Sequence, residues 1–142
     1  MKIRHVGIVC EDLNLMENFY ENFGFKKFSE NIESGKYIDH LTNIIGTKII
    51  WKKYNNKFGD LLELLKYEVS FNVDKSIFSQ PVYRRGVSHI AFTVPDIKNT
   101  SELVKRLGGC LVNEPILSQD GKVKVCYAND VEGNLIELVE EL

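Results

Sequence analysis

The chain repeats itself, and this internal repeat constrains its fold more than any other feature of the sequence. At a shift of 84 residues, the segment RHVGIVCEDLNLMENFYENFGF aligns without a gap with SHIAFTVPDIKNTSELVKRLGG, and His5 meets His89. At a shift of 74 residues, FGDLLELL aligns with EGNLIELV, and Glu63 meets Glu137. A repeat of this length indicates two copies of one structural module.

The alignments also give the bounds of the modules. The first module occupies about residues 1–68 and the second about residues 86–142, and residues 69–85 form the predicted connection. Because the two shifts differ by ten, the first module has about ten extra residues in its middle. A length of 142 residues suits a single domain, so we expect both modules to belong to one domain, 1–142.

Each module has the pattern of a strand, a helix and three further strands. IRHVGIVC and SHIAFTV are rich in β-branched residues, which favours strands. Asp12 and Asp96 are suitable N-caps for the helices that follow, and Gly24 and Gly108 are suitable residues to end them. Three apolar runs follow each helix: KFSENI, TKIIWKKY and LLELLKY, then CLVNEPI, KVKVCYAN and NLIELVEE. The predicted fold class is α+β, with two βαβββ modules in tandem forming a curved mixed sheet around a central cleft.

The alternation of side chains along a strand places the histidines and glutamates apart from the large apolar residues. His5 shares a face with Gly7 and Val9, and His89 shares a face with Ala91 and Thr93. Small residues beside each histidine suit a cavity. In LLELL and LIELV, each glutamate points away from the leucines and isoleucine next to it.

A carboxylate in the middle of an apolar strand is costly to bury without a partner. Taken singly, a histidine in a strand is usually structural and a glutamate is usually on a solvated face. Four such residues related by the repeat, His5, Glu63, His89 and Glu137, predict instead a shared divalent metal ion in the cleft. Two imidazoles and two carboxylates suit an octahedral metal such as Ni, Co, Mn, Fe or Zn, with room for water or substrate.

The overall composition excludes several classes of protein. A net charge of -2 argues against a nucleic-acid-binding protein. With no long apolar run in the sequence, we expect neither a membrane-spanning segment nor a signal peptide. The three cysteines cannot all pair within the chain, and reduced thiols in a cytoplasmic protein are the simplest interpretation.

Other polar and aromatic residues have simpler interpretations. Lys52-Lys53 and Arg84-Arg85 are read as solvated charges, although Arg84-Arg85 precede the His89 strand closely enough to contact an anion. Trp51 is assigned to the core or to the rim of the site. His40 has no counterpart in the repeat and is interpreted as a surface residue or a substrate contact.

These segments resemble the vicinal oxygen chelate superfamily, which includes glyoxalase I, bleomycin resistance proteins, methylmalonyl-CoA epimerase, extradiol dioxygenases and fosfomycin-resistance proteins. The matching pieces are RHVGIVCEDLNLMENFYENFGF, LLELL, GVSHIAFTVPDI and DVEGNLIELVEEL, and together they cover nearly the whole chain. The resemblance implies paired βαβββ modules, four metal ligands at His5, Glu63, His89 and Glu137, and a homodimer.

The resemblance also implies a chemistry, a proton abstraction next to a metal-bound carbonyl. A glyoxalase I-like (lactoylglutathione lyase-like) enzyme is the first expectation because bacterial glyoxalase I has glutamate at the Glu63 position. Glu137 is the first candidate for the base and Glu63 the second. The alternatives are a methylmalonyl-CoA epimerase-like isomerase, an Fe(II) dioxygenase-like enzyme and a small-molecule-binding resistance protein.

The substrate is expected to be a small molecule. Glyoxalase I places an arginine four residues after its first metal ligand and an asparagine four residues after its second, both for glutathione. Val9 and Tyr67 occupy these positions here. Together with Thr93 and Arg85, they are the candidate substrate contacts.

Overall fold

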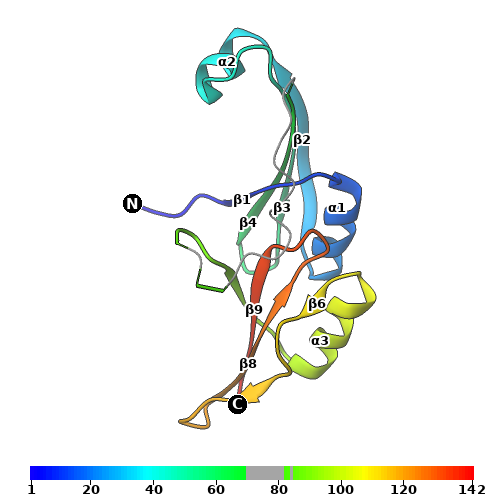
Figure 1. Cartoon of the computed structure of the whole chain (residues 1–142), viewed down its shortest axis with the longest axis vertical. Helices are drawn as coiled ribbons and strands as arrows, with labels where there is room; N and C mark the ends of the chain where they lie inside the picture. Colours follow the sequence, from blue (N-terminus) through cyan, green and yellow to red (C-terminus); the bar gives the residue numbers. More distant parts are fainter. Residues whose placement is uncertain (70–81, 84) are drawn as a thin grey trace. The chain divides into compact units, whose positions relative to one another are not determined.

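The computed structural model describes residues 1–69, 82, 83 and 85–142 (Figure 1). It divides into two compact units, Met1–Asp74 and Lys75–Leu142, which are called the first and the second module below. Most of the predicted connection, 69–85, lies outside the described residues.

The first module is a four-stranded mixed sheet with two helices. Its elements are β1 (Val6–Val9), α1 (Leu13–Asn22), β2 (Lys26–Ser34), α2 (Lys36–Thr42), β3 (Lys48–Asn55) and β4 (Leu61–Glu68). The strand order is β1-β4-β3-β2, in which β1 runs parallel to β4 and the other neighbours are antiparallel.

The second module has the same plan. Its elements are β5 (Ile90–Thr93), α3 (Ile97–Arg106), β6 (Cys110–Leu111), β7 (Ile116–Leu117), β8 (Val123–Asn129) and β9 (Leu135–Glu141). The strand order is β5-β9-β8-β6, with β7 also paired to β8, and β5 runs parallel to β9. The α+β class and the strand–helix–strands pattern of both modules are thus confirmed.

The structure differs from the sequence prediction in two places. The ten extra residues of the first module include a short helix, α2, which the pattern of apolar runs does not reveal. In the second module, the predicted run CLVNEPI is two short strands, β6 and β7, with Pro115 between them. Proline lacks the N–H that a continuous strand pairing requires, so the break at this point is expected chemically.

Matching caps set the ends of α1 and α3. The Asp12 carboxylate accepts hydrogen bonds from the backbone N–H groups of Asn14 and Leu15, at 2.9 and 3.1 Å. The Asp96 carboxylate accepts one from the backbone N–H of Asn99, at 2.8 Å. Gly24 and Gly108 follow the helices with φ of 89° and 92°, a left-handed conformation that favours glycine. The predicted caps and helix ends are confirmed.

The helix after the first strand of each module, α1 or α3, packs against one face of its sheet and leaves the opposite face uncovered by that helix. Met16, Phe19 and Tyr20 of α1 are fully buried, as is Leu64 of β4. In the second module, Val104 of α3, Ile136 and Leu138 are fully buried. Because side chains alternate along a strand, Glu63 and Glu137 point to the open faces, away from these cores. No helix of the described residues is long and apolar enough to cross a membrane.

Candidate active site

In the first module, two parallel strands bring His5 and Glu63 into contact. Gly7 of β1 lies opposite Glu63 of β4, so His5, two residues earlier, projects from the same face. The His5 Nε2 atom lies 3.1 Å from Glu63 Oε2. The glutamate side chain is 12% exposed and the histidine ring is about one-third exposed, so the imidazole lies on the solvent side of a more enclosed carboxylate.

In the second module, His89 and Glu137 repeat this contact. Ala91 of β5 lies opposite Glu137 of β9, and His89 Nε2 lies 3.4 Å from Glu137 Oε2. The Ser88 hydroxyl lies 2.8 Å from His89 Nδ1, which leaves Nε2 to face the carboxylate. The Glu137 side chain is 22% exposed, more than its counterpart in the first module.

The atoms in each pair fit a divalent metal ion. Imidazole nitrogens and carboxylate oxygens that bind such an ion at roughly 2.1 Å lie about 3.0 to 3.4 Å from each other. The two observed separations, 3.1 and 3.4 Å, fall in this range. Within either module taken alone, no third His, Cys, Asp or Glu of the described residues joins the pair to form a cluster of three. Each module therefore offers half of the predicted four-ligand set.

The two half-sites differ in the residue beside the glutamate. In the first module, Lys53 of β3 lies opposite Glu63, and its ammonium nitrogen is 3.3 Å from Glu63 Oε1. At the equivalent place in the second module, Tyr127 of β8 lies opposite Glu137, with its ring edge-on to the His89 ring at 5.2 Å. The interpretation of Lys52-Lys53 as solvated charges is therefore wrong. Lys53 contacts Glu63, and Lys52, whose side chain is 14% exposed, forms an ion pair with Glu17.

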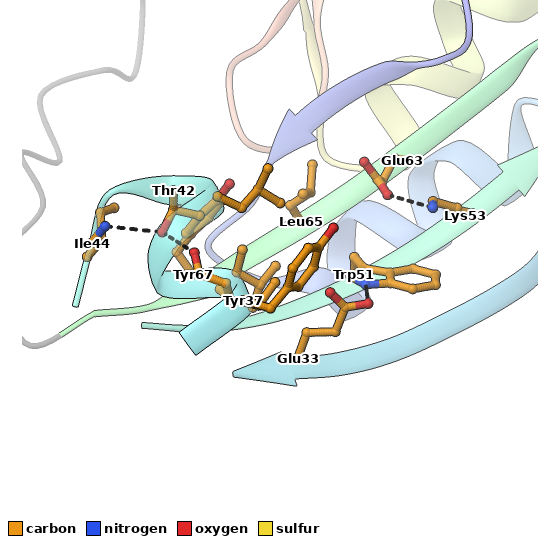
Figure 2. Close-up of a pocket in the computed structure, with 12 residues that line it drawn as sticks. Glu33, Tyr37, Thr42, Ile44, Trp51, Lys53, Glu63, Leu65 and Tyr67 are labelled. Atoms are coloured by element: carbon orange, nitrogen blue, oxygen red, sulfur yellow. Dashed lines mark hydrogen bonds and ion pairs between the residues drawn. The ribbon is translucent and has the colours of Figure 1, made fainter. Parts of the chain in front are cut away.

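Two further residues support Lys53. Its ammonium lies over the Trp51 ring, 4.2 Å from the ring centroid, which is a favourable cation–π contact. The Trp51 Nε1–H donates a hydrogen bond of 3.0 Å to the Glu33 carboxylate on β2. A connected series of side chains thus crosses the open face of the sheet, from Glu33 to His5. Figure 2 shows its part from Glu33 to Glu63.

A pocket of about 520 Å³ begins at this series and extends beneath α2. Glu63 and Lys53 lie at one end of it, and Thr42 and Ile44 lie at the other (Figure 2). Apolar and aromatic side chains form most of its wall: Tyr37, Ile38, Leu41, Ile44, Ile49, Trp51, Leu65 and Tyr67. The pocket is built entirely from residues of the first module.

The candidate substrate contacts are spread over both modules. Tyr67 lines the pocket. Val9 is exposed at the end of β1, and Thr93 is exposed at the end of β5, each on the face that carries the histidine of its module. Arg85 is exposed ahead of β5. Arg84 lies outside the described residues, and His40 is exposed on α2.

Comparison with known proteins places this fold in a family. The model of the Glyoxalase/Bleomycin resistance protein/Dioxygenase superfamily matches residues 4–127, and the chain belongs to that superfamily. This confirms the resemblance recognised in the sequence.

Several individual relatives within this superfamily are named as lactoylglutathione lyases. The chain is 29% identical over 111 residues to a probable lactoylglutathione lyase of Vibrio cholerae, which covers 74% of this chain and 80% of the relative. It is 25% identical over 115 residues to lactoylglutathione lyases of Neisseria meningitidis, which covers 75% and 81%. These relatives support a glyoxalase-like function.

The fold has close counterparts among solved structures. A glyoxalase family protein from Bacillus cereus aligns over 100% of this chain and 95% of its own, with a TM-score of 0.91 and 25% identity. A fosfomycin resistance protein from Listeria monocytogenes, in complex with Mn(II), aligns over 96% and 87%, with a TM-score of 0.62 and 17% identity. The second likeness concerns the fold alone.

Proposed function

We propose that the protein is a metal-dependent glyoxalase-like lyase or isomerase, which removes a proton next to a substrate carbonyl. The observation that carries this proposal is the repeated contact between a histidine Nε2 and a glutamate Oε2, at 3.1 Å in one module and 3.4 Å in the other. Two structural pairs would not need the same residue types at equivalent strand positions, whereas a shared divalent ion would.

His5, Glu63, His89 and Glu137 would together hold one ion. Two neutral imidazoles and two carboxylates carry a charge that balances a 2+ cation. Such an ion, when bound, polarises a carbonyl oxygen and stabilises the negative charge that develops on it. The half-sites would meet either within one chain or between two copies in a homodimer.

The surroundings of the glutamates support different roles for them. Glu63 is the more enclosed, and both His5 and Lys53 contact its carboxylate. Glu137 is more exposed, and no lysine or arginine of the described residues forms an ion pair with it. A base must release its contacts to reach a substrate proton, which costs Glu137 less. Glu137 is therefore the proposed base, and Glu63 remains a fixed ligand.

The relatives suggest a hemithioacetal as substrate, because several are named lactoylglutathione lyases. Val9 and Tyr67 stand where the resemblance places the glutathione-binding arginine and asparagine. These two residues argue against glutathione as part of the substrate. The second candidate is therefore the epimerisation of an acyl thioester, in which the same base acts on the same kind of carbon.

Metal analysis and two variants test the proposal. Purified protein, offered Ni, Co, Mn, Fe or Zn, should bind about one equivalent of at least one of them, and His5→Ala should abolish this. Glu137→Gln should keep metal binding but lose at least about 100-fold in turnover, the usual contribution of a general base. Less than about 0.1 equivalent of every metal would refute the site, and full turnover by Glu137→Gln would refute the assignment of the base.

The class of substrate is then identified by assaying three kinds of candidate compound. Metal-loaded protein is assayed with glutathione hemithioacetals, acyl-CoA thioesters and catechols. Turnover of the first supports the lyase, and turnover of the second supports the isomerase. Oxygen uptake with catechols would instead support the dioxygenase-like alternative and overturn both.

A further inference from the structure

We infer that the pocket beneath α2 is a substrate subsite for a bulky apolar group, aliphatic or aromatic. The substrate would then be a carbonyl compound with a large apolar substituent, whose reacting end lies at His5 and Glu63. This inference rests on the proposed function for the chemistry at the reacting end, but the apolar subsite is argued from the pocket alone.

Two of the polar groups that line the pocket, the Thr42 hydroxyl and the Trp51 indole N–H, are satisfied within the protein. The Thr42 hydroxyl donates a hydrogen bond to the Ile38 carbonyl at 2.8 Å and accepts one from the Ile44 N–H at 3.2 Å. The Trp51 Nε1–H is bound to Glu33. These two groups offer little to a polar ligand. The other side chains at the α2 end are aliphatic residues and the tyrosines Tyr37 and Tyr67, so apolar and aromatic surface makes up most of what a ligand would contact there.

The two ends of the pocket differ in polarity. Its charged end is formed by Glu63 and Lys53, and Tyr67 of β4 lies four residues further along the strand. Four residues of a strand span about 13 Å. A substrate lying along β4 would thus place its polar carbonyl near the half-site and its apolar part between α2 and the sheet (Figure 2).

The size of the pocket decides what kind of group it takes. A volume of about 520 Å³ lies in the usual range for small-molecule sites. A methyl group, similar in size to a water molecule at roughly 30 Å³, would leave most of it empty. The pocket therefore suits a substituent much larger than methyl.

The wall that creates this volume is particular to the first module. Tyr37, Ile38, Leu41 and Thr42 belong to α2, which lies in the ten residues that the second module lacks. Leu41 is 64% exposed, so it contributes to the wall without being part of the core. The inserted helix thus turns an open sheet face into a pocket.

Trp51 is the only tryptophan of the chain, and it lines the pocket, so its fluorescence reports binding. The metal-free protein is titrated with straight-chain methyl ketones, from acetone to 2-octanone. Each added methylene should tighten binding by about 4-fold until the pocket is full, as burial of apolar surface requires. Equal affinities along the series would overturn the inference.

Two variants make the test specific. Leu41→Ser should remove most of the gain per methylene, whereas Leu15→Ser should keep it, because Leu15 is a 51% exposed residue of α1 that does not line the pocket. Tyr37→Ser serves as a second pocket variant if Leu41→Ser does not fold. The same gain in all variants would place the binding elsewhere and refute the subsite.

The titration needs neither metal nor turnover, so it separates the two proposals. A gain per methylene in a protein that binds no metal would keep the subsite and refute the proposed function. Metal binding together with turnover that does not depend on the length of the substrate chain would keep the proposed function and refute the subsite. When both hold, kcat/KM should rise with the size of the apolar substituent, and Leu41→Ser should flatten this rise.

Discussion

Lys53 Nζ lies 3.3 Å from Glu63 Oε1, whereas the corresponding position beside Glu137 holds Tyr127. The two half-sites are thus alike in histidine and glutamate but differ in charge by one ammonium group. Under the proposed function, that difference would give different roles to two glutamates that the repeat makes equivalent, and it should change both metal affinity and turnover when it is removed.

We expect Lys53→Met to bind a divalent ion more tightly and to turn over more slowly. The ammonium repels a cation and occupies one oxygen of Glu63, so its removal should raise affinity by about 10-fold, a size expected from Coulomb repulsion between neighbouring charges near water. If the proposed function holds, the same ammonium would stabilise the negative charge that develops on the substrate, so turnover should fall without it. Calorimetric titration with metal and steady-state kinetics measure the two effects.

Lys48→Met is the matched control. Lys48 lies on the same strand and pairs with another glutamate of β4, Glu68, at 2.9 Å, but it does not line the pocket. It should leave both metal affinity and turnover unchanged. Equal effects of the two substitutions, or weaker metal binding by Lys53→Met, would contradict the role given to Lys53.

The sequence predicts the parts of this site that the repeat duplicates. The His and Glu positions and the caps at Asp12 and Asp96 follow from aligning the chain with itself. The parallel pairing of the first and last strands of each module is seen only in the structure, since the sequence predicted no more than a mixed sheet. Lys53 was missed because its partner in the alignment, Tyr127, shares neither charge nor shape with it. The sequence did contain this information, because the shift of 74 residues that aligns Glu63 with Glu137 also aligns Lys53 with Tyr127.

The pocket could not be predicted in the same way. It depends on α2, and a helix of seven residues gives too few turns for a clear apolar period. The helix begins after Gly35 and ends at Thr42, and the next residue, Asn43, has a left-handed backbone with φ of 56°. Ile38 of α2 is buried and lines the pocket together with Ile49 of β3, but nothing in the sequence pairs Ile38 with a residue of the sheet.

Gly24 and Gly108 offer a test of the helix ends. Both have a left-handed backbone, so alanine at either position should destabilise the protein by about 1 kcal/mol. An added Cβ at Gly108 would also lie 3.2 Å from Val131 Cγ2, whereas at Gly24 it would meet no atom within 4 Å. Gly108→Ala should therefore cost more than Gly24→Ala in guanidinium unfolding. The reverse order would contradict the geometry around Val131.

Glu17 should make stability depend on acid pH. Burial by itself raises the pKa of Glu17, but hydrogen bonds from the Lys52 and Lys27 ammonium groups outweigh it and hold the pKa below its ordinary value of 4.5. A lowered folded-state pKa gives stability that is present above pH 4.5 and is lost as the pH falls through the folded value. Glu17→Gln should thus reduce the free energy of unfolding at pH 7 and flatten its decline in acid.

The control for this prediction is Glu102→Gln, since Glu102 pairs with Lys105 on the surface of α3 and its side chain is largely exposed. This variant should unfold with the acid dependence of the parent protein. Denaturant unfolding at a series of pH values measures all three proteins. If the free energy of unfolding of Glu17→Gln falls with acid pH as steeply as that of the parent protein, Glu17 does not cause this pH dependence.

The last prediction asks which modules share a metal site. His5→Ala damages the half-site of the first module, and His89→Ala damages that of the second. If each site joins the two modules of one chain, a mixture of the two variants, unfolded and refolded together, has a defect in every site and stays inactive. If each site joins modules of two chains, a mixed dimer contains one site from two intact half-sites.

Random pairing would then restore about one quarter of the sites, because half of the dimers are mixed and each has one intact site of two. The mixture should therefore regain about one quarter of the metal-binding sites and of the activity of the parent protein, measured at equal total concentration. Each variant refolded alone serves as the baseline. Recovery assigns the site to two chains; no recovery in a mixture shown by mass spectrometry to contain mixed dimers assigns it to one.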